Sequence, residues 1–154
     1  MTRVAVPSRH RIAVVLLLVL PVLLSGFATD HARAGAARNR DRMLQLLNQV
    51  RADEGRRPLE LDAELSRYAL RHSRAMAEAG SLFHSTDLAA RLKGREWTIG
   101  GENVGDGPSL EGLLDAFMGS APHRKNVLRR GFDHAGVGVV KSDGSLWVTV
   151  IFYG

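Results

Sequence analysis

The chain has 154 residues, of which 24% are charged and 45% are apolar, and it contains 16 glycines and no cysteine. This length suits one ordinary domain, and the balance of apolar and charged residues is that of a globular protein rather than a disordered or fibrous one. The absence of cysteine excludes a disulfide framework, a cysteine-ligated zinc or iron–sulfur site, a thiol nucleophile and a lipid-anchored N-terminal cysteine.

The first 34 residues are predicted to be a secretory signal peptide. Arg3, Arg9 and Arg11 open the chain, an apolar run of thirteen residues follows from Ile12 to Leu24, and Ala32-Arg33-Ala34 provides a small-residue cleavage site. Thirteen helical residues span about 20 Å, which is shorter than the ~30 Å hydrocarbon core of a bilayer. We therefore expect cleavage after Ala34, a mature domain over residues 35–154 and a secreted, extracytoplasmic location. An uncleaved signal that anchors the domain to the membrane is the alternative.

The positive charge of the whole chain does not predict a nucleic-acid partner. The formal net charge is +5, but residues 1–34 hold four of the 21 basic residues and one of the 16 acidic residues. Residues 35–154 then carry 17 basic and 15 acidic residues, a net charge of +2. No basic run exceeds two residues, so the sequence lacks the clustered charge that a nucleic-acid backbone requires.

The mature chain is expected to begin with helices. Helical spacing of apolar residues predicts helices over 38–54, 62–79, 109–118 and 120–128. Asp62 is the expected N-cap of the second helix, and Gly80 is the expected residue that ends it. Residues 58–61 are expected to form an extended connector. Residues 81–108 show no clear period, so we expect a loop with at most a short strand near Trp97–Ile99.

The apolar period changes from 3.6 to 2 near the C-terminus. Ala135–Val140 and Leu146–Tyr153 are rich in strand formers, and Asp143-Gly144 between them is a strong hairpin signal. The second run is apolar on both faces, so it needs cover on both sides. The preceding helices can supply that cover. The predicted fold class is therefore α+β, a three-layer α–β–α sandwich with a small antiparallel sheet ending in a C-terminal hairpin.

His84, Glu102 and His123 are the candidate site residues because they lie at the boundaries of predicted elements. Two imidazoles and one carboxylate on loops held by a scaffold can be metal ligands, or can act as a base and its orienting group. Their spacings of 18 and 21 residues match no short-range metal motif. Structural histidines near helix ends are therefore the alternative interpretation.

Four neighbouring polar residues have structural interpretations. His72 falls on the predicted buried stripe of the second helix, which favours a hydrogen-bonded core histidine. Ser120 precedes Ala-Pro, as an N-cap does, and no Gly-x-Ser-x-Gly elbow surrounds it to indicate a nucleophile. His134 is expected in a loop or on the surface, and Asn126 is expected to fix the local backbone.

The order of these motifs resembles the CAP superfamily, whose members share the SCP domain and include cysteine-rich secretory proteins, antigen-5 and plant pathogenesis-related proteins. Phe83-His84-Ser85 and Gly101-Glu102-Asn103-Val104 carry the first part of the resemblance. Residues 117–128 are similar to the pattern W-x-x-S-x-x-H-R-x-N-I-L of the bacterial branch, with Phe117 in place of Trp. The resemblance covers residues 40–154, essentially the whole predicted domain.

The resemblance implies a secreted α–β–α sandwich with a cleft lined by His84, Glu102 and His123. The corresponding histidines bind zinc or a related divalent ion in some members, so His84 and His123 are the implied metal ligands. A second family glutamate would fall at Ser120 and is absent here. This departure weighs against a mechanism that uses two carboxylates.

Two functions and one structural alternative follow. The first is a non-catalytic extracellular binding module for a lipid, a cell-wall fragment or a protein, because the implied cleft has one carboxylate and no recognisable nucleophile. The second is a metal-assisted hydrolase, in which zinc held by His84 and His123 lowers the pKa of a bound water and Glu102 accepts a proton or orients an imidazole. In the third, the three residues form a hydrogen-bonded network that ties a loop to the sheet. The binding module is the expected function, with no catalytic residue assigned.

Overall fold

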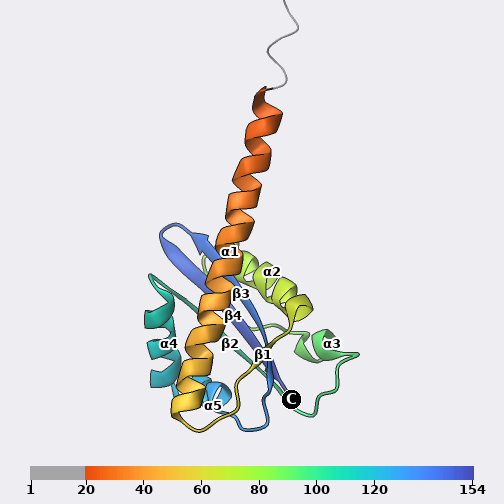
Figure 1. The fold of residues 1–154 in the computed structure, drawn as a ribbon, viewed down its shortest axis with the longest axis vertical. Coiled ribbons are helices and arrows are strands. Elements are labelled where there is room, and N and C mark those ends of the chain that lie inside the picture. Colours follow the sequence, from red (N-terminus) through yellow and green to blue (C-terminus); the bar gives the residue numbers. More distant parts are fainter. Residues whose placement is uncertain (1–19) are drawn as a thin grey trace, which may run out of the picture. The chain divides into compact units, whose positions relative to one another are not determined.

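The computed structural model describes residues 20–154, with side chains from His31 onward (Figure 1). The chain divides into two units, Met1–Arg33 and Ala34–Gly154, and the second contains the sheet. Within the described residues, no helix is long and apolar enough to cross a membrane. The basic start and most of the apolar run of the predicted signal peptide lie outside the described residues, so this segment and its cleavage stay predictions.

The elements are α1 (Leu20–Asp53), β1 (Glu60–Leu61), α2 (Ala63–Ala79), α3 (Leu88–Leu92), β2 (Gly100–Gly107), α4 (Leu110–Gly119), α5 (Ala121–Val127), β3 (His134–Ser142) and β4 (Ser145–Tyr153). The strands form one sheet in the order β1-β3-β4-β2. The α+β class is confirmed, but the sheet is mixed rather than antiparallel, because β1 pairs parallel to β3. Such pairing needs a long crossover connection, and α2 and the elements after it provide one.

Helices cover both faces of the sheet, so the predicted three layers are confirmed. α1, α4 and α5 share one buried cluster with β3 and β4, whereas α2 and α3 share a second cluster with β4. β4 contributes to both clusters, with Val148, Val150 and Phe152 in the first and Ile151 and Tyr153 in the second. Figure 1 shows the strands between α2 and α3 on one side and α4 and α5 on the other.

Local signals place several element ends where the sequence predicts them. Asp62 caps α2 by accepting the Leu65 N–H at 2.8 Å, and Gly80 ends the helix with a left-handed φ of 60°. Asp143 and Gly144 have φ values of 49° and 82° in the turn between β3 and β4. These positive angles match the mirror-image turns that join antiparallel strands.

α2 lies directly against β3 at two glycines. A Cβ atom at Gly138 would lie 2.1 Å from the carbonyl carbon of Ala69, and one at Gly136 would lie 2.5 Å from Leu65 Cγ. Both separations are far below van der Waals contact, so a side chain at either position would force the helix away from the sheet. The two glycines therefore set the position of α2 and of the loop that follows it.

The prediction of a loop over residues 81–108 is wrong in part, because this region contains α3 and the eight-residue strand β2. The sequence of β2, GGENVGDG, holds four glycines and is a poor strand former. It becomes a strand because β4 pairs with its whole length, from Gly100 opposite Tyr153 to Gly107 opposite Leu146. The long-range pairing therefore overrides the local preference.

The described part of α1 extends from Leu20, well before the predicted start at Arg38. Five alanines between residues 28 and 37 favour the longer helix. Near its other end, the fully buried Arg51 donates hydrogen bonds to the carbonyls of Val127 at 2.7 Å and Phe132 at 2.7 Å. This arginine fixes the end of α5, the helix that carries the candidate residue His123.

Candidate functional site

Two of the three candidate residues are joined by a hydrogen bond. The Glu102 side chain is 4% exposed, and its Oε1 atom accepts a hydrogen bond from His84 Nδ1 at 2.8 Å. The same oxygen accepts the Ser85 backbone N–H at 2.9 Å, and Oε2 accepts the Ser85 hydroxyl. Three donors from two consecutive residues therefore hold this carboxylate.

The hydrogen bond to Glu102 also sets which nitrogen of the His84 ring carries the proton. A carboxylate can only accept, so Nδ1 of His84 carries the proton, and in the neutral ring Nε2 keeps its lone pair. The His84 side chain is 61% exposed, so the oriented ring is open to solvent. In this arrangement Glu102 orients the His84 imidazole, and each of its two carboxylate oxygens accepts a hydrogen bond.

His123 lies close to this pair. Asn103, the residue after Glu102, donates from Nδ2 to the His123 carbonyl at 3.0 Å, and the His123 ring packs on Phe117 with centroids 5.2 Å apart. Burial, and secondarily the charge of His84, lower the pKa of His123 below its usual value, which favours the neutral ring. Among the described residues, no hydrogen bond links this imidazole to His84 or Glu102.

Asn126 connects β2 to α5 next to the candidate residues. Its Nδ2 atom donates to the Glu102 carbonyl at 3.2 Å and to Asn103 Oδ1 at 2.9 Å. The expectation that Asn126 fixes the local backbone is wrong, because the backbone carbonyl that it holds belongs to Glu102 in β2, 24 residues away. Sequence reasoning missed Asn103 and Ser85, although each directly follows a candidate residue.

The other polar residues singled out in the sequence have structural contacts. His72 is buried and donates from Nε2 to the Phe83 carbonyl at 2.9 Å, as expected of a core histidine. Ser120 is the N-cap residue of α5, but its side chain makes no capping hydrogen bond. His134 is the first residue of β3 and stacks on Tyr153 with centroids 4.8 Å apart.

The loop over residues 81–85 is fixed to the core and still exposes apolar side chains. Leu82 is 46% exposed and Phe83 is 41% exposed. The Phe83 carbonyl is held by His72, and His84 and Ser85 are held by Glu102. A loop that is ordered in the free protein loses little conformational entropy when a ligand binds to it.

The donor set does not fit a zinc site with three protein ligands. The described residues contain no group of three or more His, Cys, Asp or Glu side chains that could hold a metal ion. His84 and His123 offer two imidazoles, one fewer than most catalytic zinc sites use. Both Glu102 oxygens already accept hydrogen bonds. Zinc binding at the two histidines stays a prediction.

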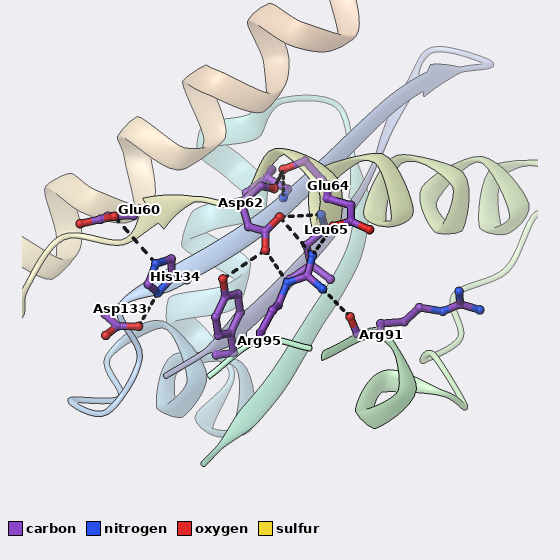
Figure 2. A network of polar contacts seen from close by, with 11 residues as sticks. Glu60, Asp62, Glu64, Leu65, Arg91, Arg95, Asp133 and His134 are labelled. Atoms are coloured by element: carbon purple, nitrogen blue, oxygen red, sulfur yellow. Dashed lines mark hydrogen bonds and ion pairs between the residues drawn. The ribbon is translucent and has the colours of Figure 1, made fainter. Parts of the chain in front are cut away.

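A second shielded carboxylate, Asp62, lies at the start of α2 (Figure 2). It accepts hydrogen bonds from Arg95 Nε at 2.5 Å, from the Tyr153 hydroxyl at 3.1 Å and from the Leu65 N–H at 2.8 Å. Burial alone would raise its pKa. The hydrogen bond from Arg95, helped by the other donors, outweighs burial and lowers the pKa of Asp62 to about 2.

Comparison with known proteins identifies the family. Residues 44–152 match the CAP family, the cysteine-rich secretory protein family. The chain belongs to this family. The resemblance drawn from the motifs around His84, Glu102 and His123 is thereby confirmed, in a member without cysteine.

Two Bacillus subtilis proteins are similar to this CAP protein in sequence. The uncharacterised protein YkwD is 31% identical over 126 residues, which are 77% of this chain and 49% of YkwD. The uncharacterised membrane protein YlbC is 31% identical over 107 residues, which are 63% of this chain and 30% of YlbC. The chain thus spans about half of the first relative and less than a third of the second.

Solved structures share the fold. An extracellular SCP-domain protein from Bacillus anthracis matches 80% of this chain and 43% of its own, with a TM-score of 0.70 and 25% identity. An outer surface protein from Borrelia burgdorferi matches 75% of this chain and 92% of its own, with a TM-score of 0.67 and 18% identity. At 18% identity, the likeness to the Borrelia burgdorferi protein concerns the fold alone.

Proposed function

We propose that this CAP protein is a secreted, non-catalytic binding module, and that residues 81–85 form its contact surface for an extracellular ligand. One observation carries the proposal. Both oxygens of the buried Glu102 accept hydrogen bonds from His84 and Ser85, so the carboxylate holds and orients the loop that contains these two residues. The Bacillus anthracis relative, described as extracellular, supports the location, as does the signal peptide proposed for residues 1–34.

The chemistry of the loop indicates the kind of ligand. Leu82 and Phe83 expose apolar surface beside the oriented imidazole of His84. A ligand with an apolar part and a hydrogen-bonding group would match both features. Lipids, cell-wall fragments and protein partners all contain such combinations, and two of these classes can be supplied as purified probes.

Phe83→Ser is the variant that tests the contact surface. Removal of the exposed ring should weaken binding about tenfold, either to purified cell wall in a sedimentation assay or to short-chain phosphatidylcholine in an NMR titration. Trp97→Ser is the matched control, because Trp97 is another exposed aromatic residue, at 36%, outside the loop. Equal loss in both variants would contradict the assignment of the loop.

A metal titration separates the binding module from the hydrolase alternative. If wild-type protein bound zinc stoichiometrically in calorimetry, and both His84→Ala and His123→Ala abolished that binding, the two histidines would form a metal site. Turnover of cell wall by the wild-type protein that is lost in His123→Ala would overturn the non-catalytic proposal. We expect no turnover, whether or not zinc binds, because Glu102 serves to hold His84 and Ser85 in the proposed contact loop.

A further inference from the structure

A pocket of about 330 Å³ lies between α2 and α3, and it includes none of the three candidate residues. Its lining residues include five cations and one carboxylate, Glu64. The cations are Arg67 and Arg71 from α2, Arg91 from α3, and Lys93 and Arg95 from the segment after α3. The pocket is therefore strongly positive, although residues 35–154 as a whole are nearly neutral.

Two of the five cations have fixed acidic partners. Arg95 contacts Asp62 and lies 3.4 Å from Glu64, and Arg91 pairs with Asp87. Figure 2 shows the Arg95 side chain directed toward Asp62, with a further contact to Arg91. These two arginines form a fixed wall of the pocket, and their charge is compensated.

The other three cations have no acidic partner among the described residues. Arg67, Arg71 and Lys93 are exposed and line the pocket. Arg67 and Arg71 lie one helical turn apart, so their side chains emerge on the same side of α2. The guanidinium of Arg71 lies 5.8 Å from the centroid of the Tyr68 ring, which also belongs to the lining. Three like charges around one concavity repel one another until an anion enters.

We propose that this pocket binds a phosphate-bearing anion with two or more negative charges, at a site separate from the loop over residues 81–85. Guanidinium groups present paired N–H donors that match two phosphate oxygens at once. A single carboxylate would leave most of the three uncompensated charges unpaired. The volume is at the small end of ligand pockets and suits a diphosphate or a phosphorylated headgroup. A soluble phosphate ester and a phospholipid headgroup are the two sources of this chemistry.

The test compares two double variants of the full chain. Arg67→Gln with Arg71→Gln removes two pocket charges, whereas Arg74→Gln with Arg130→Gln removes two exposed charges outside the pocket. Calorimetry uses inorganic pyrophosphate and short-chain phosphatidic acid below its micelle concentration. Short-chain phosphatidylcholine is titrated in parallel to measure the lipid binding that is due to the loop over residues 81–85. The pocket variant should raise Kd about tenfold or more, and the control less than about twofold. Thermal unfolding by circular dichroism verifies that both variants fold.

The outcomes are distinct. Pyrophosphate binding with this pattern supports a soluble phosphate ligand, and binding of phosphatidic acid alone supports a lipid headgroup. Absence of binding to both anions overturns the proposal, as does equal weakening in the two double variants. Lys93→Gln removes the third charge from the other side of the pocket and should also weaken binding. This variant provides the test if the first one does not fold. None of these variants changes the loop over residues 81–85. Failure of the phosphate proposal would therefore not overturn the proposed function, which Phe83→Ser tests.

Discussion

Asp62 and Glu102 are two shielded carboxylates, but the ends of their networks differ. Asp62 accepts four hydrogen bonds from three residues, and Glu102 accepts three from two residues. Asp62 is held by Arg95, whose side chain is 15% exposed, and by Tyr153 in β4. Glu102 is held by His84, whose side chain is 61% exposed. We call the first network closed, because Arg95 and Asp62 are both shielded although Arg95 also reaches the exposed Glu64. We call the second network open, because it ends at the surface on the exposed imidazole of His84. Burial of the carboxylate is common to both networks, so the exposed imidazole of His84 is what distinguishes the one at the proposed contact surface.

The largest expected effect is on the closed network. Asp62→Ala removes the cap of α2 and leaves the shielded guanidinium of Arg95 without its main partner. We expect a loss of about 3 kcal/mol in the free energy of unfolding, measured by urea denaturation. Asp115→Ala, at an exposed carboxylate of α4, should change stability by less than about 0.5 kcal/mol. Similar losses in the two variants would show that the network stabilises nothing.

Acid should weaken the closed network over a defined range of pH. Folding lowers the pKa of Asp62 from 3.8 to about 2, so the stability that its ionised form provides is complete above pH 4 and is lost as the pH falls toward 2. The loss attributable to this group is about 2 kcal/mol. Asp62→Asn should lack this part of the pH dependence, which stability curves of both proteins between pH 2 and 5 would reveal. Parallel curves would refute the assignment.

The smallest expected effect is on the open network. Glu102→Gln replaces one acceptor oxygen with an NH₂ group that faces donors from His84 and Ser85. We expect a loss of about 1–2 kcal/mol, with faster amide exchange confined to the loop over residues 81–85. Glu78→Gln, at an exposed carboxylate of α2, is the control and should leave this exchange unchanged. Faster exchange across the whole sheet would mean that Glu102 supports the core rather than the loop.

The sequence predicts best those elements whose signals are local. The ends of α2 follow from Asp62 and Gly80, and the final hairpin follows from Asp143-Gly144. β2 could not be predicted in this way, because its glycine-rich chain is extended only through pairing with β4, whose partner residues lie 39 to 53 positions later. α3 is missed for a different reason, because a helix of five residues is too short to show a helical period.

The candidate site also divides into a part that the sequence predicts and a part that it does not. The motifs around His84 and Glu102 made both residues candidates, but their hydrogen bond depends on how the loop after α2 meets β2. The basic pocket shows no signal in the sequence. Its five cations are spread from Arg67 to Arg95 and never form a run of more than one, so the fold alone brings them together.

The contacts of α5 with β2 have a consequence for solubility. β2 is at one edge of the sheet, with β4 on one side, and an open strand edge can recruit strands from other molecules. Asn126 of α5 occupies the backbone carbonyl of Glu102 on this strand, and the His123 carbonyl accepts from the Asn103 side chain. The helix that carries the second candidate histidine thus covers part of this edge, and we expect disruption of α5 to become apparent first as self-association.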